Sequence, residues 1–246
     1  MNLEQEFAAF QQTFEKKPYT PERALALIDL TLLNNEASEA EIQALVDKAN
    51  QHQVAAVCVY PKHLAYTNKL VSPKSVTVIN FPDGSDPIAD TVQAIEQLPV
   101  VDEIDYVFPY QAYANGIRKA ALAHCTQALE ASKKKKALFK VIIETGALPS
   151  DLIYPLCREL IKIGCDFIKT STGKIPQGAT PLAAFAILKA LKDSASHCGI
   201  KISGGVKTTD EAYYYMAMAQ QFLHRPLDKT WFRIGASSLI DDLAKS

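Results

Sequence analysis

The feature that most constrains the fold of this 246-residue chain is a repeated unit, in which a short β-branched or aromatic-rich segment precedes an amphipathic stretch. This alternation is typical of βα units, whose parallel strands are joined by returning helices. Candidate strands lie at residues 27–31, 54–60, 75–80, 103–108, 139–144, 166–170, 199–203 and 231–235. Eight such units in about 250 residues predict a closed (β/α)8 barrel, the TIM barrel.

Helix start signals between the strands support this interpretation. They are two capping boxes, Ser38–Glu41 and Thr208–Glu211, and two cap-proline pairs, Asp86-Pro87 and Thr180-Pro181. In each pair the first residue is expected to cap the helix and the proline to occupy the first helical position, where its missing N–H costs nothing. The rival architecture, an open doubly wound sheet, normally has a GxGxxG turn after its first strand, and the sequence has none.

No Gly/Ser-rich or low-complexity linker interrupts the series, so we expect one domain over residues 1–246. Residues 1–24 are expected to form an N-terminal helical extension. The predicted fold class is therefore α/β, a single TIM barrel with an extra N-terminal helix.

The composition excludes several classes of protein. Hydrophobic residues make up 48% and charged residues 22%, and no apolar run approaches the roughly 20 residues of a membrane helix. The net charge of -1 provides no field that would recruit nucleic acid or an anionic membrane. The N-terminus lacks the pattern of a signal peptide, so a cytoplasmic location is the expectation. The five cysteines and five histidines have no metal-ligand spacing, so we expect no metal.

Charged residues interrupt five of the predicted strands, at Asp29, Asp105, Lys140, Lys169 and Lys201. A charge inside a covered strand is costly unless it is paired or used. One interpretation is a neutralised ion cluster with a structural role. The other, a functional cluster, is favoured because barrel interiors are filled mainly by branched apolar side chains.

Such a cluster can make a lysine nucleophilic. With the reference pKa of ~10.4, only about one lysine in 2,500 is neutral at pH 7, whereas a pKa of ~7 makes half of them neutral. Desolvation and a neighbouring ammonium together can produce this change. The neutral amine attacks a carbonyl, and the resulting iminium ion lets the adjacent C–C bond break or form. Asp105, acting through water and the second lysine, is the candidate acid/base group.

The loops after the last three predicted strands combine glycine with hydroxyl or lysine groups, at residues 171–174, 203–207 and 235–238. Glycine lets backbone N–H groups approach an anion, and in barrels the phosphate site commonly lies after strands 7 and 8. A single Gly-Gly pair is usually a tight turn, but three such loops indicate a phosphate site.

Seven motifs together resemble deoxyribose-phosphate aldolase, from about residue 25 onward: DLTLL (29–33), CVYPKH (58–63), EIDYVFPY (103–110), FKVIIETG (139–146), DFIKTSTGK (166–174), KISGGVKT (201–208) and RIGASS (233–238). The resemblance implies reversible cleavage of 2-deoxy-D-ribose 5-phosphate to acetaldehyde and D-glyceraldehyde 3-phosphate, without a cofactor, in deoxynucleoside and deoxyribose catabolism. The expected partners are these phosphosugar and aldehyde substrates, with neither nucleic acid nor membrane. A homodimer remains open.

Position by position, the resemblance implies that Lys169 is the Schiff-base lysine, Lys201 the lysine that lowers its pKa, and Asp105 the acid/base partner. It implies substrate contacts at Asp29, Thr31, Cys58, Thr170, Gly173, Lys174, Gly204, Gly205, Gly235, Ser237 and Ser238. Cys58 can equally be a small strand hydrophobe. Two departures from the family pattern are Asp83 and Lys207, the latter where many members have arginine, which binds phosphate with two donors.

Two alternatives remain open at this point. One is a Schiff-base aldolase for another phosphosugar, because the same cluster would serve it. The other is a phosphosugar-binding barrel without turnover, in which the lysines only balance charge.

Overall fold

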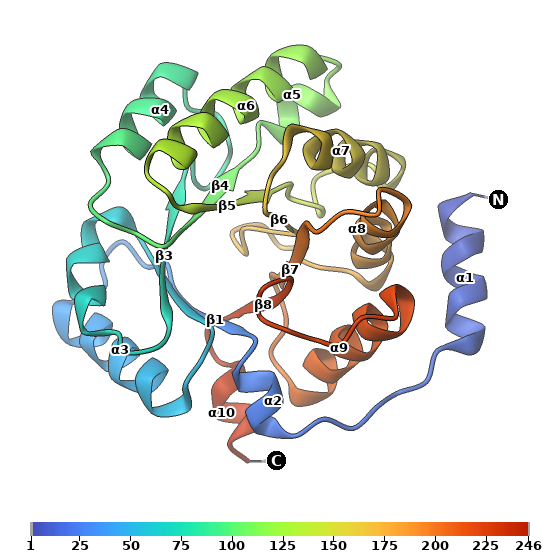
Figure 1. Cartoon of the computed structure of the whole chain (residues 1–246), viewed down its shortest axis with the longest axis horizontal. Helices are drawn as coiled ribbons and strands as arrows, with labels where there is room; N and C mark the ends of the chain where they lie inside the picture. The colour runs from blue at the N-terminus through green and yellow to red at the C-terminus, as the bar shows by residue number, and fades with distance from the viewer. Residues whose placement is uncertain (1, 246) are drawn as a thin grey trace.

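Eight parallel strands close on themselves in the computed structural model, which describes residues 2–245 (Figure 1). The strands are β1 Ile28–Leu32, β2 Ala56–Val59, β3 Lys74–Ile79, β4 Glu103–Val107, β5 Leu138–Ile142, β6 Phe167–Lys169, β7 Gly199–Ser203 and β8 Phe232–Ala236. Each strand pairs with the next one in sequence, and β8 pairs with β1. The predicted TIM barrel is confirmed, and each predicted strand lies within two residues of an observed one.

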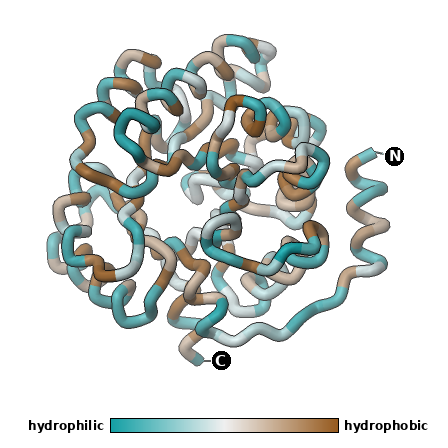
Figure 2. Tube along the Cα trace, viewed as in Figure 1, coloured by the Kyte–Doolittle hydropathy of each residue, from teal (hydrophilic) through white to brown (hydrophobic). Residues whose placement is uncertain are grey.

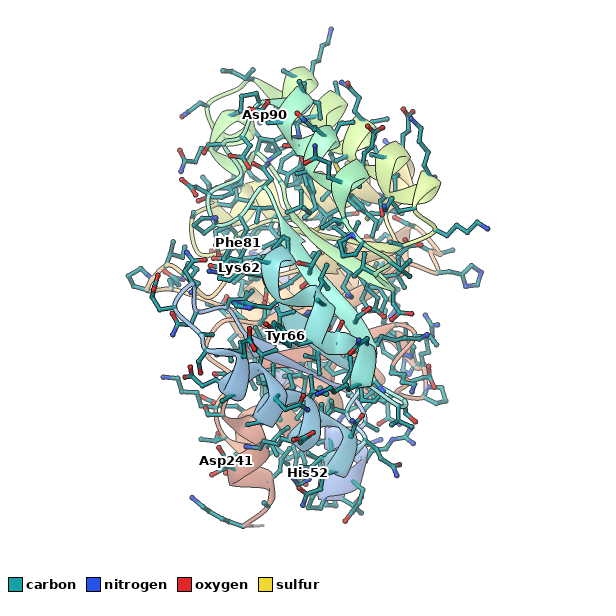
Figure 3. The ribbon with its side chains drawn as sticks, turned by 90° about the vertical axis from the view of Figure 1, so that its left-hand side faces the viewer. His52, Lys62, Tyr66, Phe81, Asp90 and Asp241 are labelled. Carbon is teal, nitrogen blue, oxygen red and sulfur yellow. The ribbon has the colours of Figure 1, made fainter. Side chains whose placement is uncertain are left out.

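Helices surround the barrel. They are α1 Leu3–Thr13, α2 Pro21–Leu25, α3 Glu39–His52, α4 Ile88–Gln97, α5 Tyr110–Ala114, α6 Arg118–Lys134, α7 Ser150–Ile163, α8 Pro181–Asp193, α9 Thr209–Leu223 and α10 Leu239–Leu243. After β2 the connection is a 3-10 helix, η1 Pro61–Lys69. Figure 3 views the side covered by α3 and η1, where His52 and Tyr66 are labelled.

Three of the four predicted helix starts are confirmed. Both capping boxes are present, at the starts of α3 and α9. Thr180 Oγ1 accepts a hydrogen bond from the N–H of Ala183 at 3.2 Å, which caps α8. The expectation for Asp86-Pro87 is wrong, because Pro87 is itself the N-cap and α4 begins one residue later. The N–H of Asp86 instead donates to Asn80 Oδ1 at 2.8 Å, which ties Asp86 to the end of β3.

The predicted N-terminal helix is also confirmed, as α1, which packs on α8. The ring centroids of Phe7 and Phe10 lie 5.2 and 5.6 Å from that of Phe185. An ion pair of 2.8 Å between Glu6 and Lys189 adds a polar contact at the same junction. The extension therefore covers the outer surface of one helix of the ring (Figure 1).

The buried apolar residues form two clusters. The larger cluster lies mainly between the strands and the helices. Along the helices, hydrophobic and hydrophilic stretches alternate (Figure 2). The smaller one consists of Ala56, Cys58, Val76 and Val78, from β2 and β3. Among residues 2–245, no helix combines the length and apolarity that a membrane crossing needs.

Candidate active site

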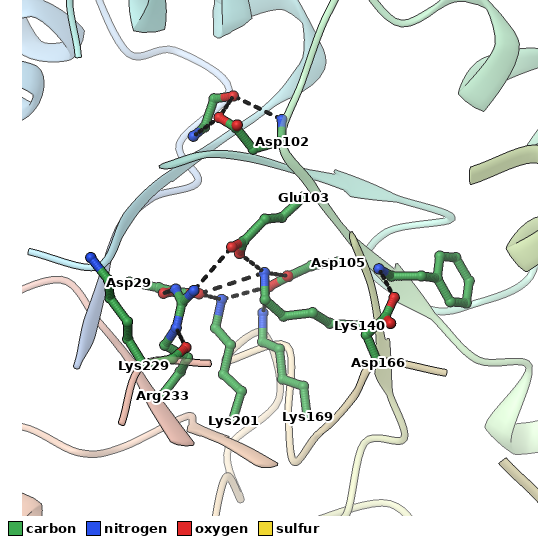
Figure 4. Close-up of polar contacts among 12 residues, drawn as sticks. Asp29, Asp102, Glu103, Asp105, Lys140, Asp166, Lys169, Lys201, Lys229 and Arg233 are labelled. Carbon is green, nitrogen blue, oxygen red and sulfur yellow. Dashed lines mark hydrogen bonds and ion pairs between the residues drawn. The ribbon is translucent and has the colours of Figure 1, made fainter. Parts of the chain in front are cut away.

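The strand register brings the five predicted charged residues together inside the barrel. Lys169 on β6 pairs with Lys201 on β7, and Asp105 on β4 pairs with Lys140 on β5. Side chains alternate along a strand, so paired positions on neighbouring strands present them to the same face. Lys169 is 3% exposed, and the other four residues, including Asp29, are fully buried. The charges therefore meet in one place (Figure 4).

Two further charged residues, Glu103 and Arg233, belong to the same cluster and were not singled out from the sequence. Arg233 on β8 contacts Asp29 at 2.5 Å and Glu103 at 3.0 Å. Glu103 also contacts Lys140. A signal was available, because Glu103 lies two residues before Asp105 on the same strand and so faces the same side.

Lys169 is the lysine nearest to solvent in this cluster. Its Nζ lies 2.7 Å from Asp105 Oδ2, and the Nζ of Lys201 lies 2.7 Å from the same oxygen. Burial lowers the pKa of Lys169; Asp105 opposes this effect, the ammonium of Lys201 reinforces it, and the net direction is downward. The amine of Lys169 is thus the cluster's available nucleophile.

Lys201 and Asp105 have the opposite electrostatic balance. Burial acts to lower the pKa of Lys201, but the carboxylates of Asp105 and Asp29 outweigh it and raise that pKa. Burial acts to raise the pKa of Asp105, but Lys140, Lys169 and Lys201 outweigh it and hold that pKa well below its usual value. In the free enzyme the two residues are therefore a charged pair beside a lysine whose pKa is lowered.

A cavity of about 350 Å³ opens above Lys169 at the carboxyl ends of the strands. Its walls include nine residues singled out from the sequence: Thr31, Lys169, Gly173, Lys174, Gly204, Gly205, Gly235, Ser237 and Ser238. Lys207 lines it as well, whereas Asp83 lines a different hollow beside Gly84 and Pro109. The three predicted loops therefore meet around one cavity that carries two lysines at its rim.

Two glycines are required by this geometry. Gly204 has a φ of +83°, and a Cβ there would lie 3.0 Å from Gly178 Cα and Ser171 Cβ. At Gly235 a Cβ would lie 3.0 Å from Lys201 Cε. Gly204 therefore shapes the loop, and Gly235 leaves room for the stem of Lys201.

Three predicted substrate contacts are not among the residues that line the cavity. Asp29 lies fully buried with Lys201 and Arg233. Cys58 packs in the small apolar cluster, where burial raises the pKa of its thiol to about 11. The hydroxyl of Thr170 donates to the carbonyl of Ser203 and accepts from its N–H, both at 2.9 Å, which joins β6 to β7. These three side chains are therefore not placed to contact a ligand in the cavity directly.

Glu144, just after β5, is a further residue that sequence reasoning did not single out. It is fully buried, and its carboxylate accepts hydrogen bonds from the N–H and hydroxyl of Thr172. That hydroxyl in turn accepts from the N–H of Lys174 at 3.0 Å. Burial raises the pKa of Glu144. Glu144 therefore fixes the loop that carries Gly173 and Lys174 into the cavity.

A larger hollow of about 560 Å³ lies between the N-terminal extension and the ends of α8 and α9. Two of its cations are occupied by neighbouring rings, Lys192 by Phe222 at 4.6 Å and Arg225 by Trp231 at 4.8 Å. Within the described residues, no group of three His, Cys, Asp or Glu side chains is arranged to hold a metal ion. The cavity above Lys169 is therefore the candidate active site.

Fold and site together define a barrel with a buried amine at the carboxyl ends of its strands, below a glycine-rich cationic rim, where barrel enzymes carry their active sites. The model of the DeoC/LacD family aldolases matches residues 23–239. The chain belongs to this family of aldolases.

Solved structures agree on the fold. A protein from Coccidioides immitis, provisionally described as a deoxyribose-phosphate aldolase, is 22% identical with a TM-score of 0.83, covering 100% of this chain and 98% of that one. An aldolase named QR15 is 26% identical with a TM-score of 0.79, over 90% and 96%. The deoxyribose phosphate aldolase of Aeropyrum pernix, described as a tetramer, is 24% identical with a TM-score of 0.77, over 92% of each chain.

Proposed function

We propose that this protein is a Schiff-base aldolase that cleaves 2-deoxy-D-ribose 5-phosphate reversibly to acetaldehyde and D-glyceraldehyde 3-phosphate, in the cytoplasm. The observation that carries the proposal is the position of Lys169. Its amine contacts Asp105, and its side chain lines a cavity that has a cationic rim. Membership of the DeoC/LacD aldolase family supports carbon–carbon lyase chemistry, and the site motifs support this particular substrate.

The reaction begins with attack of the neutral Lys169 amine on the aldehyde carbon of the open-chain sugar. The carbinolamine loses water, with its oxygen protonated on leaving, and an iminium ion remains. Removal of the proton from the 3-hydroxyl then breaks the C2–C3 bond, releases glyceraldehyde 3-phosphate and leaves an enamine on Lys169. Protonation of the enamine carbon and hydrolysis by water release acetaldehyde and restore the amine.

Asp105 and Lys201 are the groups that this scheme uses for proton transfer. Asp105 Oδ2 lies 2.7 Å from both amines, so it can pass protons between Lys169, Lys201 and a water in the cavity. Lys201 stays charged beside it and disfavours a second positive charge on Lys169. The lowered pKa of Lys169 favours its reactive, neutral form in the free enzyme. When the iminium ion forms, its positive charge faces the carboxylate of Asp105.

The rim provides the contacts for the 5-phosphate. Lys174 and Lys207 supply positive charge, and the backbone at Gly204 and Gly205 is free of side chains that would keep an anion away. Lys174 Nζ donates to the carbonyl of Leu33 at 2.6 Å, which uses one of its three donors and keeps the ammonium over the cavity.

Trapping of the imine tests this proposal directly. Borohydride reduction with acetaldehyde should add an ethyl group to Lys169, mapped by mass spectrometry. Lys169→Met should abolish trapping, whereas Lys174→Met, a matched loss of a cavity lysine outside the cluster, should leave it. An adduct on another lysine would overturn the assignment. Cleavage rates on deoxyribose 5-phosphate and on fructose phosphates then decide the substrate, because faster cleavage of fructose phosphates would favour the other phosphosugar.

A further inference from the structure

The buried charges form a closed ring of alternating sign. The ion ring consists of Arg233, Asp29, Lys201, Asp105, Lys140 and Glu103, in that order, with Glu103 returning to Arg233. Arg233 contacts Asp29 at 2.5 Å and Glu103 at 3.0 Å, and Lys201 contacts Asp29 at 2.5 Å and Asp105 at 2.7 Å. Lys140 contacts Asp105 at 3.0 Å and also Glu103. Each cation of the ion ring therefore contacts at least two carboxylates and each carboxylate at least two cations, and a longer contact of 3.8 Å between Lys140 and Asp29 crosses the ring (Figure 4).

The ion ring is neutral without Lys169. Its three cations balance its three carboxylates, and five strands supply its members. Lys169 comes from a sixth strand and adds a second amine to Asp105 Oδ2, which Lys201 already occupies. A proton on Lys169 would give this buried group of seven side chains an uncompensated positive charge, which a low-dielectric interior penalises.

We propose that Glu103 and Arg233 are positioning residues that act through the ion ring. Their charges set the electrostatic potential at the amine of Lys169, and therefore how readily that amine is protonated. Neither residue lines the cavity, whereas Lys169 does, so neither is placed to touch substrate. The inference rests on the proposed function and deepens it, because it names two residues whose opposed charges set how readily the nucleophile is protonated.

Several other titratable groups lie around Lys169, and Glu103 and Arg233 differ from them. The titratable groups near it are Asp105 from β4, Lys140 from β5, Lys201 from β7, Asp29 from β1, Cys58 from β2 and Glu144 after β5, with Lys174 and Lys207 at the rim. β3 contributes Val76 and Val78 to the interior. Glu103 and Arg233 differ from the other members of the ion ring because neither contacts Asp105, Lys201 or Lys169, so a change there alters charge without removing a group that touches either amine.

The expected effects have opposite signs. Glu103→Gln leaves the ion ring with one extra positive charge and should shift the deprotonation of Lys169 to lower pH. Arg233→Gln leaves one extra negative charge and should shift it to higher pH. Glu103 is linked to Lys169 through Lys140 and Asp105 by contacts that include 3.0 and 2.7 Å, so the charge lies within about 10 Å of the amine. A unit charge at about 10 Å and an effective dielectric of ~20 moves the midpoint by about one pH unit.

The test measures the protonation of the Lys169 amine and does not depend on enzymatic turnover. The rate of acetylation of Lys169 by trace acetic anhydride is followed against pH by mass spectrometry in the wild type, both single variants and the double variant Glu103→Gln/Arg233→Gln. The singles should move the midpoint in opposite directions, and the double variant should return it to the wild-type position. Shifts in the same direction, or no shift, would overturn the inference.

Charge-conserving variants keep the test decisive if one variant does not fold. Arg233→Lys and Glu103→Asp disturb packing but keep the charge, so their midpoints should stay in place. Either pair, such as Arg233→Gln against Arg233→Lys, is sufficient by itself. Failure of the proposed function has a different signature, because then acetaldehyde and borohydride would leave Lys169 unmodified whatever the acetylation profile shows.

Discussion

Separate replacement of Lys201 and Lys169 by methionine should give very different losses of stability, although both amines are buried and both lie 2.7 Å from Asp105 Oδ2. Methionine keeps most of the lysine stem and removes the amine. Lys201 belongs to the ion ring, whereas Lys169 is the additional amine outside it. The comparison therefore tests whether the two lysines carry different charges in the folded protein.

The magnitude for Lys201→Met follows from the charges that remain. Asp29 and Asp105 each lose a partner, and breaking a buried ion pair costs about 3–5 kcal/mol of unfolding free energy. Lys169 can then take up a proton and balance Asp105, since Lys201 no longer disfavours it, but it does not reach Asp29. Protonating the Asp29 carboxyl instead costs about 4.2 kcal/mol at pH 7 and about 1.5 kcal/mol at pH 5 for a reference pKa of ~3.9. That carboxyl then has a higher pKa folded than unfolded, so the variant's stability deficit shrinks as the pH falls from 7 to 5.

Lys169→Met leaves the ion ring complete. It removes one hydrogen bond to a charged group, worth about 1.5–3 kcal/mol. The variant also no longer bears the cost of an amine whose pKa is lower in the folded than in the unfolded state, which offsets part of this loss, so the net loss should stay below about 2 kcal/mol. Urea unfolding at pH 7 and pH 5, followed by circular dichroism and by fluorescence of the single buried Trp231, measures both variants. Equal losses at pH 7, or a Lys201→Met loss independent of pH, would refute the charge assignment.

Three further predictions concern the surroundings of the cluster. Gly204→Ala should raise the KM for the phosphorylated substrate while leaving acetaldehyde trapping unchanged, because a φ of +83° costs a side chain about 1–3 kcal/mol and distorts only the rim loop. Glu144→Ala should raise that KM about tenfold, the equivalent of ~1.4 kcal/mol, and Glu144→Gln less, since Gln retains an acceptor for Thr172; equal effects would count against this role. Cys58, with a thiol pKa of about 11, should resist iodoacetamide at pH 8 until urea unfolds the chain; rapid alkylation of the folded protein would contradict its placement.

The barrel was predictable because its signals are local. Each strand is a short run of β-branched or aromatic residues, and boxes such as Ser38–Glu41 and Thr208–Glu211 mark helix starts by chemistry within one turn. The start of α4 was misplaced because the competing contact is not local. Asp86 is held by Asn80 across the turn, and no capping rule contains that contact.

The charged cluster was only partly predictable, for a related reason. Lys140, Lys169 and Lys201 stand out because each interrupts an apolar run, whereas Glu103 lies at the start of its strand, where charges are ordinary. Arg233 lies inside the predicted strand 231–235, so the rule that selected the lysines applies to it as well. Which charge meets which depends on the strand register and on the closure of the barrel. The sequence pattern of a single strand contains neither.

The composition of the barrel interior explains how one lysine can differ from its neighbours. β2 and β3 fill their part of the interior with Ala56, Cys58, Val76 and Val78, while the ion ring occupies the part bounded by β1, β4, β5, β7 and β8. Buried ion pairs seldom add net stability over apolar packing, so six paired charges are better explained by the environment that they create than by the stability that they provide. Lys169, on β6, is buried and shares its carboxylate partner with the ammonium of Lys201, and each of these two circumstances lowers its pKa. Both disfavour its proton, and the chemistry proposed for its amine depends on that combined effect.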